Sequence, residues 1–362
     1  MNSLMTKKGA LKNFPALQST STGIAGPPAI SEIHAFAVRG TGSEPAYSVL
    51  QVSTHSGIVG YGECRPLSPA DLEDLNRLAG KSAFAYEALT PLAPEPARGG
   101  FNMALLDILG KHTNAPVYRV LGGPTRFEAR AIAKLSGSSD DDLQASLRQQ
   151  LSAGVRAFLV PIANPTARNQ GSQFVKVNVD RFTALRTAAP DSDFAIESAD
   201  QLTPEDAAML AVALQPHHPL WFDEPCDVTN LQTLRKVSDQ TVVPLGFGRT
   251  IRSASTFQDL LREGVIDLVR PDLLLYGISG ACRIASMAEP YYTAVAPWHS
   301  AGPIATAAAL HAAASMPNFF VFQIPNSGAS SAVIRNGFFE LPKGPGLGIT
   351  VDISKFERNR IA

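Results

Sequence analysis

The sequence predicts an α/β protein: a (β/α)7β modified TIM barrel with an N-terminal α+β capping domain. Two observations predict it. From residue 129 onward, eight short apolar runs alternate with helical patterns over about 200 residues, the order typical of a parallel barrel. Before residue 127, strand-like segments gather ahead of one helical stretch. A doubly wound open sheet is the alternative, but neither GxGxxG nor GxxxxGKS/T follows the early strands.

These differences in sequence pattern divide the chain into four parts. We expect a mobile N-terminal lead-in at residues 1–26 and the capping domain at residues 27–127. The barrel is expected at residues 128–330 and a C-terminal segment that returns to the cap at residues 331–362. The lead-in carries charge but no continuous apolar stretch, so a signal peptide is not indicated.

The capping domain is expected to combine a small sheet with a helix. Residues 33–38 and 47–53 alternate between apolar and polar side chains, as strands do. Three glycines in HSGIVGYGEC, residues 55–64, indicate turns or close approaches between backbones. A helix is predicted at residues 102–113, where apolar residues share one stripe.

The barrel helices are predicted from their start and stop signals. In SDDDLQASLRQQLSAG, three leucines recur at helical spacing before Gly154, which is typical of a helix end. In LTPEDAAMLAVAL, Thr203 is expected to cap the helix and Pro204 to occupy its first position. A third helix, in TFQDLLREG, is expected to end at Gly264.

Composition excludes several classes of function. The chain has 362 residues, with 31 Lys and Arg against 32 Asp and Glu, so no electrostatic case exists for nucleic acid or an anionic membrane. Hydrophobic residues make up 45%, which permits a large buried core. Three widely spaced cysteines form no CxxC pattern, and no apolar stretch is long enough to cross a bilayer. We therefore expect neither a zinc site nor a disulfide framework, and a cytoplasmic location.

The residues that end the predicted barrel strands are candidates for chemistry, because barrel sites form at the C-terminal strand ends. Glu197, Asp223 and Arg249 follow one another at intervals of 26 residues, one strand–helix unit each. Their side chains should therefore be neighbours on one rim. The other candidates at strand ends are Lys134, Asp272, Trp298, His299 and Gln323.

From about Ser31 to the C-terminus, the chain resembles the enolase superfamily, in its mandelate racemase and muconate-lactonising branch. The cap motif GxxGxGE matches residues 57–63, and the domain-junction motif matches ALLDILGKHTNAPVYRVLGG, residues 104–123. The barrel motifs of the family match FAIES, WFDEP, FGRT, DLVRPD, PWHSAGP and PGLGIT. The resemblance implies the predicted fold and is closest to acid-sugar dehydratases and racemases.

The resemblance implies a Mg²⁺ site of three carboxylates, of which two are present. Glu197 and Asp223 match the first two ligand positions, but Arg249 stands at the third, and a guanidinium cannot ligate a cation. Two interpretations stay open. Arg249 fills the metal site and donates hydrogen bonds to Glu197, Asp223 or both, within about 3 Å. Alternatively, the two acids bind Mg²⁺ with help from substrate and water. We expect no cofactor unless the second interpretation, Mg²⁺ bound by the two acids, is correct.

The family's bases are also incompletely matched. Family members use a Lys or His to remove the proton alpha to a carboxylate. Asp272 matches the sixth-strand acid, as a general base, half of a dyad, or an ion-pair partner for Arg270 or another cation. Either Trp298 or His299 holds the seventh-strand His position. His299 and Lys134 remain catalytic candidates.

Three hypotheses about function follow. The first is a family member whose degenerate metal site does not support standard Mg²⁺-assisted enediolate chemistry. The second is an active lyase or isomerase, an acid-sugar dehydratase or racemase. The third is a metal-independent enzyme that uses Asp272, His299 or Lys134. Each would bind a small carboxylate-bearing molecule, with Arg249, Trp298 and Gln323 as candidate contacts. The resemblance places specificity in cap loops near residues 40–47 and 66–71, and we expect a homo-oligomer.

Overall fold

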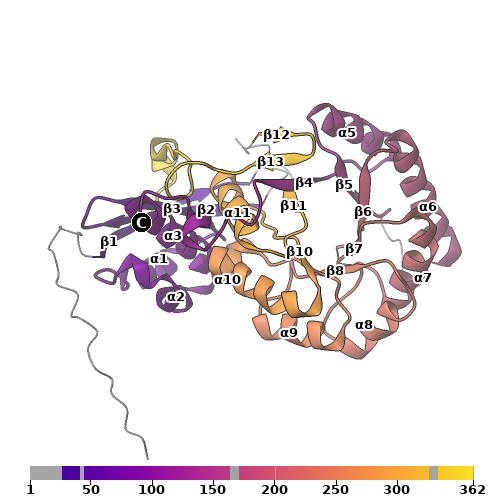
Figure 1. Ribbon diagram of the computed structural model, residues 1–362, viewed down its shortest axis with the longest axis horizontal. Coiled ribbons are helices and arrows are strands. Elements are labelled where there is room, and N and C mark those ends of the chain that lie inside the picture. Colours follow the sequence, from indigo (N-terminus) through magenta and orange to yellow (C-terminus); the bar gives the residue numbers. More distant parts are fainter. Residues whose placement is uncertain (1–26, 41–44, 164–170, 200, 326–332, 362) are drawn as a thin grey trace, which may run out of the picture.

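The computed structural model describes residues 27–40, 45–163, 171–199, 201–325 and 333–361. The predicted lead-in at residues 1–26 and part of the cap loop at residues 40–47 lie outside these ranges. Within them, a cap and a barrel lie side by side, with an outer arc of helices around the barrel strands (Figure 1). No helix in the described ranges combines the length and apolarity needed to cross a membrane.

The cap is a three-stranded antiparallel sheet packed on a long helix. Its strands are β1 (Ile30–Val38), β2 (Tyr47–Thr54) and β3 (Val59–Cys64), and its helices are α1 (Pro69–Asn76), α2 (Tyr86–Leu89), α3 (Arg98–His112) and α4 (Val117–Val120). Helix α3 begins earlier than predicted and is buried almost throughout, so no single stripe marks its start. At Gly60 and Gly62 a Cβ would collide with the α3 backbone at Ala104 and Gly100. The glycine motif therefore lets β3 and α3 touch.

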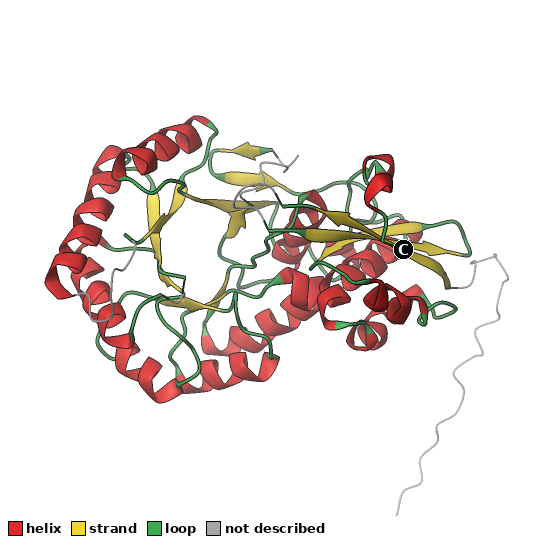
Figure 2. Cartoon of the chain, turned by 180° about the vertical axis from the view of Figure 1, so that it is seen from behind, coloured by secondary structure: helices red, strands yellow, loops and turns green. Residues whose placement is uncertain are grey.

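The barrel has the predicted (β/α)7β order in the described part of the chain (Figure 2). The strands are β4 (Glu128–Lys134), β5 (Ala157–Pro161), β6 (Asp193–Glu197), β7 (Phe222–Asp223), β8 (Leu245–Phe247), β9 (Leu268–Val269), β10 (Ala294–Val295) and β11 (Phe322–Ile324). The helices between them are α5 (Asp140–Ser152), α6 (Gly171–Ala188), α7 (Pro204–Leu214), α8 (Leu231–Ser238), α9 (Ala254–Glu263), α10 (Leu273–Ala288) and α11 (Pro303–Ser315). Strand β11 pairs in parallel with β4, which closes the barrel.

Helix ends follow the local signals. Ser139 and Asp142 form a capping box at the start of α5, and Thr203 caps α7 by accepting from the Asp206 amide. Helix α9 ends at Gly264, which is left-handed at φ +65°. Each capping residue and its partner lie close together in the sequence, which is why sequence patterns predict these caps well.

The barrel strands separate two apolar layers. A small cluster fills the inside of the barrel, and a much larger one lies between strands and helices. The inner cluster consists of Ile132, Ala157, Leu159, Ala195, Trp221, Leu268, Ala296 and Val321. Because side chains alternate along a strand, Phe322 belongs to the outer layer while its neighbours in sequence face the interior. This alternation decides which strand-end residues reach the barrel mouth.

The C-terminal segment contacts both domains. Strands β12 (Ile334–Arg335) and β13 (Phe338–Glu340) form a hairpin whose β13 pairs with β4. The chain then reaches the cap, where the Leu347 amide donates to Asp107 at 2.8 Å. The Ile361 amide donates to the Ala35 carbonyl at 2.8 Å. The tail thus ties the cap to the barrel.

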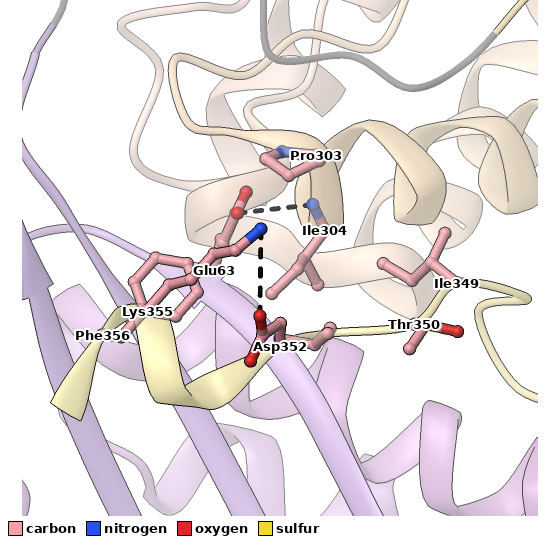
Figure 3. Close-up of a pocket in the computed structure, with 9 residues that line it drawn as sticks. Glu63, Pro303, Ile304, Ile349, Thr350, Asp352, Lys355 and Phe356 are labelled. Carbon is pink, nitrogen blue, oxygen red and sulfur yellow. Dashed lines mark hydrogen bonds and ion pairs between the residues drawn. The ribbon is translucent and has the colours of Figure 1, made fainter.

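Glu63, at the end of cap strand β3, holds the first turn of barrel helix α11. Its carboxylate accepts from the amides of Ile304, at 3.3 Å, and Ala305, at 2.9 Å. The carboxylate lines a cavity of about 280 Å³ that α11 and tail residues from Ile349 to Phe356 enclose (Figure 3). Burial raises the pKa of Glu63 to about 7, although the α11 amides act to lower it.

This raised pKa makes domain docking depend on pH. Because the folded pKa exceeds the usual 4.5, the contribution of Glu63 to stability is full below about pH 4.5 and is lost as pH rises through about 7. We expect about 3 kcal/mol of pH-dependent unfolding free energy to disappear in Glu63→Gln. Urea unfolding of both proteins at pH 5 and pH 8 measures it. An unchanged difference between the two pH values in the variant would contradict this assignment.

Candidate functional site

The two acids and Arg249 meet at the C-terminal ends of three consecutive strands. Glu197 ends β6 and Asp223 ends β7, and the two are paired directly in the parallel register. Arg249 lies two residues past the end of β8. The two carboxylates are 2% and 0% exposed. The regular spacing of 26 residues does therefore bring these side chains to one rim.

Arg249 bridges the two acids. Its Nη1 donates a hydrogen bond to Glu197 Oε1, and its Nη2 lies 3.4 Å from Asp223 Oδ2. The expected contact with Glu197 is present, while the contact with Asp223 is an ion pair that is long for a hydrogen bond. A planar guanidinium thus stands between the carboxylates.

Two further cations complete the cluster. Lys134, at the end of β4, forms an ion pair with Glu197 Oε2. Arg270, which follows β9, forms an ion pair with Asp223 Oδ2 and donates through Nη2 to Gln323 at 2.5 Å. Asp223 also accepts from the indole of Trp221 at 2.9 Å. Each acid therefore contacts Arg249 and one other cation.

The cluster sets the protonation state of its acids. Burial alone would raise the pKa of Glu197, but the positive charges of Arg249 and Lys134 hold it below its usual value. Burial likewise acts to lower the pKa of Arg249, but Asp223 and Glu197 outweigh it and raise that pKa. Glu197 and Arg249 are therefore both charged at neutral pH.

Glu224, the second acid of WFDEP, has a structural task that the sequence did not indicate. One of its oxygens accepts from the backbone amides of Gly248 and Arg249, both at 2.8 Å. Its backbone is left-handed, at φ +44°. Glu224 thereby fixes the turn after β8 that presents the Arg249 side chain.

Asp272 pairs with a cation from the cap. Arg65, just after β3, donates through Nη2 to Asp272 at 2.8 Å, and Asp272 also caps helix α10 by accepting from the Leu274 amide at 2.9 Å. Burial raises the pKa of Asp272 even though Arg65 acts to lower it. Arg270, one of the expected partners, contacts Asp223 instead. The sequence did not point to Arg65, although it directly follows the cap motif.

Trp298 and His299, in the segment that follows β10, face different layers. His299 is 3% exposed, accepts from the Ala301 amide at 3.2 Å, lies 3.3 Å from Thr306 Oγ1 and stacks on Phe322 of the outer layer. Burial lowers its pKa to about 3, so its ring is neutral. Trp298 instead lies beside the charged cluster, with its ring centre 5.8 Å from Arg249 Cζ. Trp298 therefore holds the position facing the site.

The predicted residues thus fall into three groups. Lys134, Glu197, Asp223, Arg249, Trp298 and Gln323 come together in or beside one cluster. Asp272 belongs to the boundary between cap and barrel, and His299 to the layer under α11. Within the described ranges, no three His, Cys, Asp or Glu side chains are grouped as a metal site would require.

Comparison with known proteins agrees with this architecture. Residues 142–355 match the model of enolase C-terminal domain-like proteins, and residues 28–122 match the N-terminal domain of mandelate racemase and muconate lactonizing enzyme. The chain is 27% identical to a D-galactonate dehydratase of Ralstonia nicotianae, over 88% of this chain and 92% of that protein. It is 28% identical to one of Klebsiella pneumoniae, covering 86% and 90%.

Solved structures give the same result. A mandelate racemase/muconate lactonizing enzyme from Sulfitobacter sp. superposes with a TM-score of 0.82 at 25% identity, covering 92% of this chain and 95% of that one. An enolase from Agrobacterium radiobacter, with Na and L-malate bound, has a TM-score of 0.83 at 25% identity, covering 91% and 95%. Fold and motifs together define an enolase-type barrel protein. This chain belongs to the mandelate racemase and muconate lactonizing enzyme branch of the enolase superfamily.

Proposed function

We propose that this chain is a metal-independent member of its family, one that does not perform Mg²⁺-assisted abstraction of a proton alpha to a carboxylate. The position of Arg249 carries the proposal. Its guanidinium lies between Glu197 and Asp223, where a shared cation would have to bind. The residues present therefore do not fit a divalent ion, and no catalytic step is assigned to one.

The charge of the site supports this proposal. Glu197, Asp223 and Arg249 together carry a net charge of minus one, as three carboxylates with one divalent cation would. Lys134 and Arg270 add two positive charges beside the same acids. A divalent cation entering this cluster would meet three cations at close range, and like charges in a partly buried site repel strongly.

The placement of two candidate bases supports it too. Asp272 is engaged by Arg65, and His299 is neutral and packed below α11. Each missing acid–base group typically costs on the order of 10²–10⁴ in rate. Losses of groups that act as one unit are not independent. A metal-independent role without turnover is therefore the function that this geometry favours.

The first test is activity. We expect no dehydration or racemisation of an acid-sugar library, D-galactonate included, in the presence of MgCl₂. Dehydration is followed through the 2-oxo acid product and racemisation by polarimetry. Turnover of any substrate at ~1 s⁻¹ or faster, abolished by Asp272→Asn, would overturn the proposal.

One observation favours a second candidate, an active acid-sugar dehydratase. The relatives at 27–28% identity that span most of this chain are named D-galactonate dehydratases. In that case Arg249 would hold the substrate carboxylate in place of a metal, with Lys134 as the nearest candidate base. Activity that resists EDTA and is lost in Lys134→Gln would select this alternative.

A further inference from the structure

The charged cluster at the barrel mouth consists of three acids and three cations: Glu197, Asp223, Glu224, Lys134, Arg249 and Arg270. Its acids are buried more deeply than two of its cations. Its three carboxylates, those of Glu197, Asp223 and Glu224, are at most 2% exposed. The side chains of Lys134 and Arg249 are 31% and 13% exposed. The acids therefore lie beneath, and two of their cationic partners reach the surface of the site.

A cation site needs exposed negative charge, but here the exposed charges are positive. Three open carboxylate oxygens would attract a metal, but here both oxygens of Glu197 are already occupied, by Lys134 and Arg249. The more exposed side chains of the cluster are an ammonium and a guanidinium. The cluster is close to neutral as a whole, but its accessible side is positive.

The two cations also keep hydrogen-bonding capacity. An ammonium has three donors and a guanidinium five, and one strong bond from each goes to Glu197. Among the residues that the structure describes, the Nη2 of Arg249 has only the 3.4 Å contact with Asp223. A planar carboxylate can accept from a guanidinium and an ammonium together.

Trp298 supplies an apolar wall beside these donors. Its half-buried ring lies next to the guanidinium of Arg249, in the arrangement of a cation–π contact. The body of a ligand whose acid group reaches Lys134 and Arg249 would therefore pack against this ring.

We propose that Lys134 and Arg249 bind the carboxylate of a small organic acid directly, without a divalent cation, and that Trp298 packs against the rest of the ligand. This proposal rests on the proposed function and names the ligand class of the same site. Glu197 acts as a positioning residue, because it holds both cations on one carboxylate.

The experiment measures binding to the full chain in EDTA. The probes are benzoate and D-gluconate, which offer an apolar and a hydroxylated body, benzamide as the uncharged isostere of benzoate, and inorganic phosphate. Calorimetry gives affinity. The emission of Trp298, one of two tryptophans, reports contact with its ring, and Trp298→Phe identifies the signal.

We expect at least one carboxylate to bind in EDTA and benzamide not to bind. Lys134→Gln and Arg249→Gln should each weaken carboxylate binding about tenfold or more, as the loss of a charge-assisted hydrogen bond predicts. Lys134→Gln is the safer variant for folding, because Lys134 is more exposed. Arg283→Gln is the matched control, since it removes a surface ion pair with Glu87 and should leave binding unchanged.

Several results would overturn the inference: no carboxylate bound by the wild type, equal binding of benzamide, unchanged affinity in Lys134→Gln, or binding of phosphate alone. Carboxylate binding that appears only when MgCl₂ is added would overturn the proposed function as well. Failure of binding with no Mg²⁺ affinity either would remove only the inference, so the two failures are distinguishable.

Discussion

Arg249→Ala is expected to lower the unfolding free energy by about 3 kcal/mol, because it leaves two buried acids without their shared cation. Breaking a buried ion pair typically costs about 3–5 kcal/mol. The lower end applies here, since Glu197 keeps Lys134 and Asp223 keeps Arg270. Urea denaturation at pH 7 measures the difference.

The unfolding free energy lost in Arg249→Ala should also depend on pH. The pKa of Glu197 is held low in the folded protein, so its contribution to stability is present above its usual pKa of 4.5 and is lost as pH falls below it. Without Arg249 this contribution shrinks, so wild type and variant should converge in acid. Arg283→Ala, which breaks an exposed pair, should cost less than about 0.5 kcal/mol. An Arg249→Ala loss no larger than that of this control would refute the assignment.

Arg249→Glu is expected to create a Mg²⁺ site that the wild type lacks. The change places a third carboxylate beside Glu197 and Asp223, and Mg²⁺ prefers hard oxygen ligands. Without metal, the added negative charge should destabilise the variant. Binding of Mg²⁺ to the folded state should then restore its stability by mass action. Calorimetric titration with MgCl₂ measures the affinity directly, and thermal unfolding with and without MgCl₂ measures the stabilisation.

Arg249→Gln is the matched control, because it removes the same positive charge without adding a carboxylate. Only the Glu variant should gain melting temperature in MgCl₂. Tight Mg²⁺ binding by the wild type would contradict the proposed role of Arg249. So would a folded Glu variant that binds no Mg²⁺, since Lys134 and Arg270 would then be what excludes the ion.

The fold was predictable because its signals are local and repeated. Strand ends at Lys134, Glu197 and Asp223 fall where the apolar runs predicted them. Helix caps at Ser139 and Thr203 involve partners three residues away, so they can be found from spacing. The start of α3 was missed because that helix is buried on nearly all sides and has no amphipathic stripe.

The site was predictable only in part. Equal spacing along a repeated unit placed Glu197, Asp223 and Arg249 together. The partner of Asp272 was not predictable, because Arg65 lies 207 residues away in the other domain and nothing local links them. The sequence left the choice between Trp298 and His299 open, since adjacent residues face opposite layers and a shift of one residue exchanges them.

The sequence by itself determined the family, the order of strands and helices, and the place of Arg249 one strand–helix unit after Asp223, because each is carried by residue type and spacing. Only the tertiary structure decided how the charges are paired. Lys134 could have pointed into solvent, and Arg270 could have paired with Asp272. Burial selects among such partners, since an acid removed from water is stable only beside the cations that the fold brings to it.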